Sequence, residues 1–276
     1  LIKKARSFNI RTVSPIENWG PFADRFSDIE SGQFKNYMAY LPDHILVVDE
    51  FAKNQAISEN LPEDCITIVG SIPLECLIKK SEKYPKSEIK EIRSRLGGDE
   101  NKKIVVFASQ ALKTEMGVDS PEYAGYDEED ALIDICDALL HTWPDCLLII
   151  KLHPFERIEE FIKPSALKLI NHKIIKDIPS STVISAADIV IGMISNFLME
   201  AAVKNKLVIS YQKATDTKLH FVGTALDLMY FCNNVEQLET LLRDCPKPLL
   251  SVTKYFDKIS NGATKKTISF IESVNK

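Results

Sequence analysis

The alternation of apolar runs and polar turns is clearest between residues 187 and 211. This stretch begins with the apolar, β-branched run 189–191 and ends with a second apolar run at 207–210. Between the two runs lie a short polar turn and a stretch whose apolar residues recur at helical spacing. Strand, helix and strand in this order predict two parallel strands joined by a right-handed crossover.

The polar turn of this unit contains Ser195 and Asn196, at the point where the helix must begin. Both are preferred N-cap residues, so helix capping alone would explain them. The turn also lies at the carboxyl edge of the predicted sheet, where open α/β sheets bind ligands. Free N–H groups at a helix start attract anions. From this turn alone, capping and anion binding both stay open.

Two more buried strands end in polar side chains. The apolar run 146–150 leads into KLHPFE, which places His153 just after a strand, and the run 104–108 leads directly into Ser109 and Gln110. Because the carboxyl ends of parallel strands meet at one edge of a sheet, we expect Ser109, His153 and Ser195 to lie close together. Two hydroxyl groups and an imidazole at one edge predict a site for a phosphate-bearing ligand.

The distribution of these elements predicts two α/β domains. Residues 1–72 contain three short strand-like runs, 10–13, 45–48 and 66–69, which suit the carboxyl-terminal part of a Rossmann-like domain whose opening residues are absent from this chain. Residues 73–276 alternate strands and helices as a doubly wound parallel sheet. A charged helix ended by Gly97 and Gly98 separates the two strand groups. Asp127 is expected to cap a helix over Glu128–Thr142.

The segment 113–126 has no hydrophobic periodicity and is predicted to be a long loop, either a lid or plain surface.

Composition then limits the classes of function that this protein could have. A net charge of −5 argues against non-specific nucleic-acid binding, which needs a basic surface. No apolar run reaches the ~20 residues that span a bilayer. The six cysteines are scattered, as in reduced cytosolic proteins, and the five histidines lack metal-ligand spacing, so we predict no metal site.

Several segments, taken in order, resemble GT-B glycosyltransferases. They are LPDHILVVDEFAKNQAI, ITIVGSIPLE, IVVFASQ, LLIIKLHPFE and ADIVIGMISNFLMEAA. The resemblance is to the bacterial surface-polysaccharide group, with its CDP-glycerol glycerophosphotransferases and sialyl- and Kdo-type transferases; UDP-N-acetylglucosamine 2-epimerase shares the architecture. It covers nearly the whole chain. It implies two Rossmann-type domains facing a cleft, with the last helix, Ala263–Val274, packing back toward the first domain.

The resemblance also implies roles for individual residues of the second domain. His153 matches the histidine that contacts the donor phosphate or its leaving oxygen. Ser195 and Asn196 match the turn that holds the nucleotide phosphates, and Glu200 matches a helix carboxylate that binds the ribose. Ser109 and Gln110 match the first donor-domain loop. The nucleobase would lie near residues 176–179.

On the acceptor side, the loop IENWG matches one in which several relatives place an acidic residue or a histidine. Asn18 stands where Asp or His is frequent, so Glu17 is the better candidate for the general base, with Asp24 in reserve. No acidic pair of the DxD kind follows the strands. This fits the metal-independent chemistry that the resemblance implies, in which fixed donors stabilise the departing phosphate.

The expected function is transfer of a sugar, or a polyol phosphate, from a nucleotide-activated donor to a glycan or lipid-linked glycan acceptor in surface polysaccharide synthesis, without a cofactor. The expected location is the cytoplasm, and peripheral association with the inner face of the membrane stays open. An epimerase would need further carboxylates and a second histidine in the first domain, which offers His44 alone. A non-catalytic nucleotide-sugar-binding module is the third alternative. The sequence does not determine the nucleobase.

Overall fold

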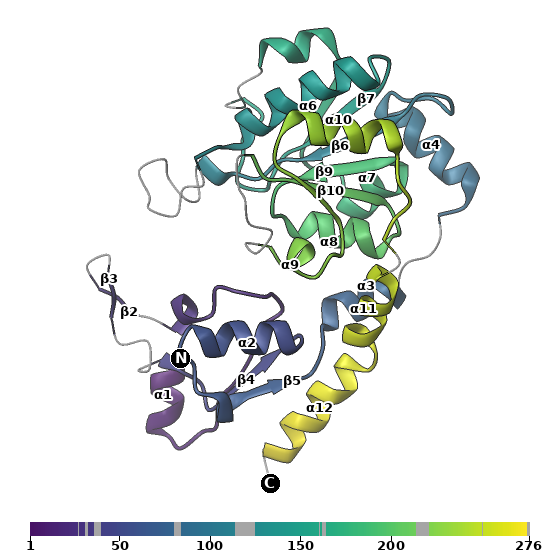
Figure 1. Ribbon diagram of the computed structural model, residues 1–276. Coiled ribbons are helices and arrows are strands. Elements are labelled where there is room, and N and C mark those ends of the chain that lie inside the picture. The colour runs from purple at the N-terminus through teal and green to yellow at the C-terminus, as the bar shows by residue number, and fades with distance from the viewer. Residues whose placement is uncertain are drawn as a thin grey trace. The chain divides into compact units, whose positions relative to one another are not determined.

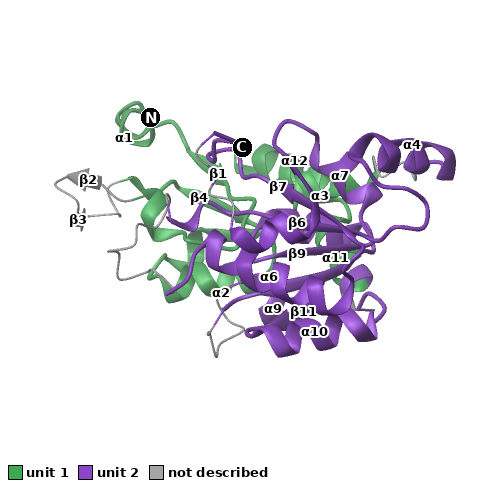
Figure 2. Cartoon of the chain, turned by 90° about the horizontal axis from the view of Figure 1, so that it is seen from above, with its two compact units in different colours: residues 1–81, 254–276 green, residues 82–253 purple. Residues whose placement is uncertain are grey.

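The computed structural model describes residues 1–26, 28–30, 33–35, 40–79, 84–113, 125–159, 161, 164–213, 221–249 and 251–274. Most of the predicted loop over 113–126 lies outside these residues. The chain forms two compact units, shown in Figure 2: unit 1 contains residues 1–81 and 254–276, and unit 2 contains residues 82–253. Each unit has its own parallel sheet.

Unit 2 is built on one sheet, whose described strands all pair in parallel. The strands are β6 (Ile104–Ala108), β7 (Leu147–Lys151), β8 (Asn171–Ile175), β9 (Ile189–Gly192), β10 (Leu207–Tyr211) and β11 (Tyr230–Cys232). Their spatial order, β8-β7-β6-β9-β10-β11, is the doubly wound Rossmann order. Chain direction along the sheet reverses between β6 and β9. This confirms the fold class predicted for the second domain.

Helices cover both faces of this sheet, which explains why its central strands are apolar without alternation. The helices are α4 (Lys86–Leu96), α6 (Glu128–Thr142), α7 (Ser180–Ala186), α8 (Asn196–Val203), α9 (Val222–Ala225) and α10 (Val235–Asp244), with a 3-10 turn, η4 (Ser165–Leu169). As Figure 1 shows, α6 and α10 pack together on one face, whereas α7 and α8 lie on the other. Asp127 caps α6 through a capping box, and Gly97, with φ +95°, ends α4 as predicted.

Unit 1 contains a parallel sheet in the order β1-β4-β5. Its elements are α1 (Ile2–Ser7), β1 (Val13–Pro15), η1 (Ala23–Phe26), an antiparallel pair β2 (Asp28–Glu30) and β3 (Gln33–Lys35), β4 (His44–Val47), α2 (Glu50–Ser58), η3 (Glu63–Cys65), β5 (Ile66–Ile68), α3 (Ile72–Lys79), α11 (Ser251–Ser260) and α12 (Ala263–Val274). The chain re-enters this unit within α11. None of the helices described here has the length and apolar character to cross a membrane.

The first strand begins later than the predicted run 10–13. Helix α1 ends with Asn9 in a left-handed conformation, at φ +54°, and the N–H of Ile10 donates to the carbonyl of Ala5. Ile10 therefore belongs to the helix terminus rather than to the sheet. Pairing with β4 starts only at Val13, opposite His44.

The units differ from the predicted bounds 1–72 and 73–276. Gly70 and Ser71, next to the predicted boundary, pack within unit 1. A side chain at Gly70 would place its Cβ 2.4 Å from the Ile259 carbonyl oxygen, and the Ser71 N–H donates to that same oxygen at 2.8 Å. Helix α12 also packs on α3, so the last helix lies against the first unit, as expected.

Candidate functional site

A pocket of about 200 Å³ opens at the carboxyl ends of β6, β7 and β9 in unit 2. It lies at the reversal point between β6 and β9, where doubly wound sheets bind their ligands. Its lining includes four of the predicted residues: Ser109, His153, Ser195 and Glu200. The structure thus brings together side chains from positions 109 to 200, and their binding roles remain predictions.

The strands deliver these side chains because each ends at the same level. The Ser109 N–H donates to the Lys151 carbonyl at 3.0 Å, which extends the β6–β7 ladder by one bond. The Leu152 N–H likewise donates to Ile175 at 2.9 Å. His153 comes next, and Pro154, which has no N–H, cannot continue the ladder.

Glu156 joins the ends of β6 and β7, and the sequence pattern did not single it out. Its carboxylate accepts the Ser109 hydroxyl at Oε1 (2.7 Å) and the His153 backbone N–H at Oε2 (2.6 Å). The Glu156 N–H donates back to the His153 carbonyl at 3.0 Å, which closes a turn over HPFE. A proline at the second position of a turn was the signal that could have identified it.

The His153 ring is held within this turn. The Phe155 N–H lies 3.4 Å from Nδ1, a long contact that favours the tautomer with the proton on Nε2. The Phe155 ring packs edge-on against the imidazole, with 5.2 Å between ring centroids. His153 is half-buried, so its ring can meet a ligand in the pocket.

The turn before α8 has the geometry of an N-cap. Ser195, at φ −92° and ψ 144°, accepts the Phe197 N–H at 3.2 Å. Gln110 accepts the Ile194 N–H at 3.2 Å, so it braces the turn from β6 and is not a lining residue. Asn196 is exposed and likewise lies outside the lining. Helix capping, one of the two interpretations of this turn from the sequence, therefore accounts for the conformation of Ser195.

Two charged groups of the pocket are partly withdrawn from water. Burial raises the pKa of Glu200, and Lys204 nearby opposes that shift. Burial lowers the pKa of Lys151, whose ammonium group donates to the Lys176 carbonyl. Lys151 was not predicted as a site residue, although its position at the end of β7, two residues before His153, was a usable signal. Lys176 itself donates to the Glu156 carbonyl at 2.7 Å, and residues 176–179 are not lining residues.

In unit 1, Glu17 lies beyond the carboxyl end of β1, as Ser71 does beyond β5. The Ser71 hydroxyl and the Ile72 N–H donate to the Glu17 carboxylate, yet partial burial outweighs both bonds and raises its pKa. The residue as a whole is still exposed. Asp24 is exposed on η1.

The rest of the IENWG loop is anchored by Asp49. This buried carboxylate accepts the Trp19 Nε1–H at 3.0 Å, the Tyr255 hydroxyl and the Ala52 N–H at 2.8 Å. Asn18 Oδ1 is buried without a hydrogen-bond partner among the residues placed here. The Trp19 ring is therefore held in place by its hydrogen bond to Asp49.

No protein-family model matches the chain, and no curated protein matches it in sequence. Solved structures do. UDP-GlcNAc 2-epimerase from Neisseria meningitidis, bound to UDP-GlcNAc, is similar with a TM-score of 0.57 and 16% identity over 98% of this chain and 71% of its own. The chain has a GT-B-type fold.

Two further structures show the same fold. Anabaena Alr3699/HepE in complex with UDP-glucose is similar with a TM-score of 0.61 and 13% identity, over 98% of this chain and 74% of that protein. A variant of the wall teichoic acid polymerase TagF has a TM-score of 0.53 and 13% identity, over 96% and 68% of the two chains. The expected two Rossmann-type units and the resemblance to GT-B proteins are thereby confirmed.

Proposed function

We propose that this protein is a metal-independent glycosyltransferase of the GT-B type. It would move a sugar, or a polyol phosphate, from a nucleotide-activated donor to a glycan or lipid-linked glycan acceptor in surface polysaccharide synthesis, in the cytoplasm. One observation carries the proposal: Ser109, His153, Ser195 and Glu200 line a single pocket at the reversal point of a doubly wound sheet. Gln110 and Asn196 would support this pocket rather than line it.

The pocket contains groups that can stabilise the departing nucleotide. As the bond to the sugar breaks, negative charge grows on the phosphate oxygens. The His153 Nε2–H, the Ser195 hydroxyl and the Lys151 ammonium are fixed donors that can stabilise this charge. The Ser109 hydroxyl is oriented by its hydrogen bond to Glu156. The half-buried Glu200 carboxylate can accept hydrogen bonds from the hydroxyl groups of a ribose.

Glu17 is the proposed base for the acceptor hydroxyl. A carboxylate with a raised pKa is a stronger base than an ordinary one, and exposure of the residue lets an acceptor reach it. Asp24, which belongs to the exposed turn η1, is the reserve candidate.

The structural neighbours support the ligand class. Their bound ligands are UDP-GlcNAc and UDP-glucose. At 13% to 16% identity these neighbours establish only the fold, so the nucleotide sugar as substrate rests on the pocket as well.

An epimerase is the second candidate, because the neighbours include UDP-GlcNAc 2-epimerases. The position of His44 argues against it. This histidine begins β4, at the amino end of a parallel sheet, and its ring packs edge-on against Phe270 with 5.2 Å between centroids. It is therefore at the opposite edge of that sheet from Glu17.

A donor screen tests the proposal. Thermal shifts with UDP-, CDP-, CMP- and GDP-sugars should reveal one nucleotide that raises the melting temperature, because ligand binding to the native state stabilises it. The donor found is then incubated with the protein, and its sugar is followed by NMR. Transfer to an added glycan supports the proposal, whereas inversion at C2 without transfer identifies an epimerase. Stabilisation without turnover by the full-length protein identifies a binding module, and stabilisation by none of the four contradicts the proposal.

A further inference from the structure

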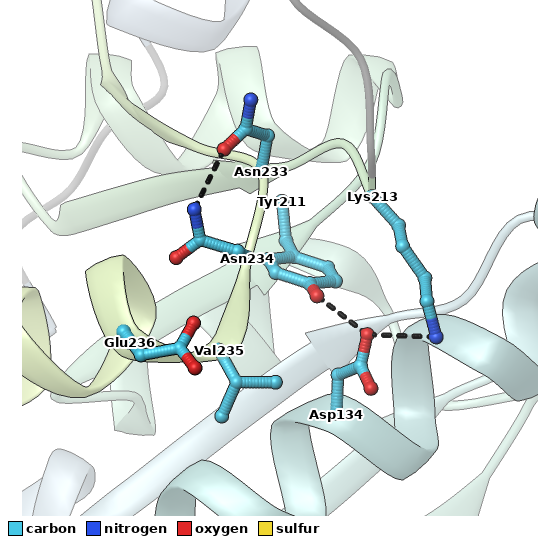
Figure 3. A pocket seen from close by; sticks show the side chains of 7 residues that line it. All are labelled: Asp134, Tyr211, Lys213, Asn233, Asn234, Val235 and Glu236. Carbon is cyan, nitrogen blue, oxygen red and sulfur yellow. Dashed lines mark hydrogen bonds and ion pairs between the residues drawn. The ribbon is translucent and has the colours of Figure 1, made fainter.

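A second pocket of unit 2 lies at the carboxyl ends of β10 and β11 (Figure 3). Its volume is about 460 Å³, which falls within the range of small-molecule sites. Its polar lining residues are Tyr211 at the end of β10, Lys213 just after that strand, Asn233 and Asn234 after β11, and Asp134 in the middle of α6. The proposed nucleotide chemistry uses none of these residues.

Asp134 is the centre of the polar wall, although only 9% of the residue is exposed. Its Oδ2 accepts the Tyr211 hydroxyl at 2.5 Å and the Lys213 ammonium at 3.0 Å. Figure 3 shows both bonds converging on that one oxygen. Among the residues that the structure describes, none donates to Oδ1. This oxygen is not one of the buried polar atoms that lack a partner, so it is open to solvent, and the pocket presents an acceptor that a ligand hydroxyl can meet.

Donors and an apolar surface complete the pocket. Lys213 has three N–H donors, and its bond to Asp134 uses one of them. The Asn234 amide caps α10 through its oxygen, at 2.9 Å from the Gln237 nitrogen, and donates to Asn233 at 3.1 Å. Val235 adds methyl groups beside these amides.

The charges favour a neutral, hydroxyl-rich ligand. Asp134 compensates Lys213, and Glu236 at the exposed rim repels anions. A sugar ring offers hydroxyl groups that donate to the Asp134 carboxylate and accept from the Lys213 ammonium. Its C–H groups can pack on Val235. A phosphate offers acceptors only and would meet two carboxylates.

The two pockets of unit 2 share no lining residue. The second pocket includes residues of α6 and α10, on one face of the sheet, whereas Glu200 belongs to α8, on the other face. The two pockets are therefore distinct sites on unit 2.

We infer that this second pocket binds a sugar ring of a glycan that is not attached to the nucleotide. This binding depends on the contacts around Asp134 and not on the proposed transfer reaction, so the two can be tested independently.

The test is an NMR titration of the whole protein, labelled in its valine methyl groups. The probes are methyl β-glucoside, methyl β-galactoside and methyl N-acetyl-β-glucosaminide, with UDP and UDP-glucose on parallel samples. The variants are Asp134→Asn and Lys213→Met, and Asp137→Asn is the matched control, because Asp137 is exposed on the same helix. Melting temperatures show that each variant is folded.

At least one glycoside should shift the Val235 methyl signals. Either test variant should weaken that binding about tenfold or more, as loss of a charged hydrogen bond predicts, and the control should match the wild type. Failure of all three glycosides to shift Val235 would overturn the inference, and so would equal binding by all variants. A shift with UDP-glucose alone would overturn it too, since the ring would then be the donor's own. If UDP binds and none of the glycosides does, the inference about the second pocket fails and the proposed transferase function is unaffected.

Discussion

The Glu17 carboxylate combines a raised pKa with exposure to solvent. Desolvation is the larger influence, and the donors from Ser71 and Ile72 oppose it only in part. A base must be deprotonated to act. Transfer should therefore be full above the Glu17 pKa and should fall as the pH drops through it, at a midpoint above the ordinary 4.5.

Glu17→Gln should lower transfer by ~10²-fold or more and should remove the acidic limb of the rate profile, with donor affinity unchanged. Steady-state rates between pH 4 and 8 measure this. Asp24→Asn is the matched variant in the same segment and should behave like the wild type. If Asp24→Asn loses activity and Glu17→Gln keeps it, the assignment is wrong.

The residues of the pocket differ in how far a sequence reveals them. Ser109, His153 and Ser195 could be predicted because each follows an apolar run that must be a buried strand. Pro154 signals the turn that contains Glu156, but hydrophobic periodicity does not reveal that the Glu156 carboxylate accepts the Ser109 hydroxyl from the neighbouring strand end. Gln110 has a suitable side chain and position, yet its carbonyl oxygen is used by the Ile194 N–H.

At the scale of elements, the approach of α8 to the sheet depends on Gly192, the last residue of β9. A Cβ there would lie 3.0 Å from Leu198 Cδ2 and 3.1 Å from the Ala108 carbonyl oxygen. Since Ala108 precedes Ser109 and Leu198 lies on α8, this glycine sets the spacing between two walls of the pocket.

Gly192→Ala should destabilise the protein by about 1–3 kcal/mol, the usual cost of overpacking a core. It should also weaken donor binding, because α8 must shift away from β6. Denaturant unfolding and a donor titration measure the two effects. Unchanged stability together with unchanged affinity would show that the spacing is not critical.

The doubly wound order was predictable because continuous apolar strands alternate with amphipathic helices. The start of β1 was not, since the hydrogen bond from Ile10 to Ala5 extends the end of α1 into an apolar run. The nucleobase was expected near residues 176–179, which follow β8. In the structure the Lys176 ammonium donates to the Glu156 carbonyl.

At the scale of the whole molecule, the chain leaves unit 1, forms unit 2 and returns. Glu75 on α3 fastens the returning segment: its carboxylate accepts the N–H and the hydroxyl of Thr264, at 2.7 and 2.8 Å, and the ammonium of Lys79. These bonds lower the Glu75 pKa to about 2. A sequence that places Thr264 so far along the chain gives no local signal of this contact.

The lowered pKa predicts how stability depends on pH. A carboxylate with a depressed folded-state pKa stabilises the fold above its unfolded value and loses that effect as the pH falls through the folded value. Glu75→Gln should therefore be less stable than the wild type at pH 7, and the difference should shrink as the pH falls from about 4.5 toward about 2. Glu272→Gln on the exposed side of α12 is the control and should show no such trend. A difference independent of pH would contradict the assigned contact.

The most direct test of the proposed function is the affinity of the nucleotide for the pocket of unit 2. Isothermal titration of the wild type with the nucleotide from the donor screen should be compared with His153→Ala, and with His141→Ala as an exposed control. We predict that His153→Ala binds roughly tenfold to a hundredfold more weakly, the worth of a charge-assisted hydrogen bond to phosphate, and that His141→Ala binds as the wild type does. Equal affinity of all three proteins would contradict the account, because the nucleotide would then not occupy this pocket.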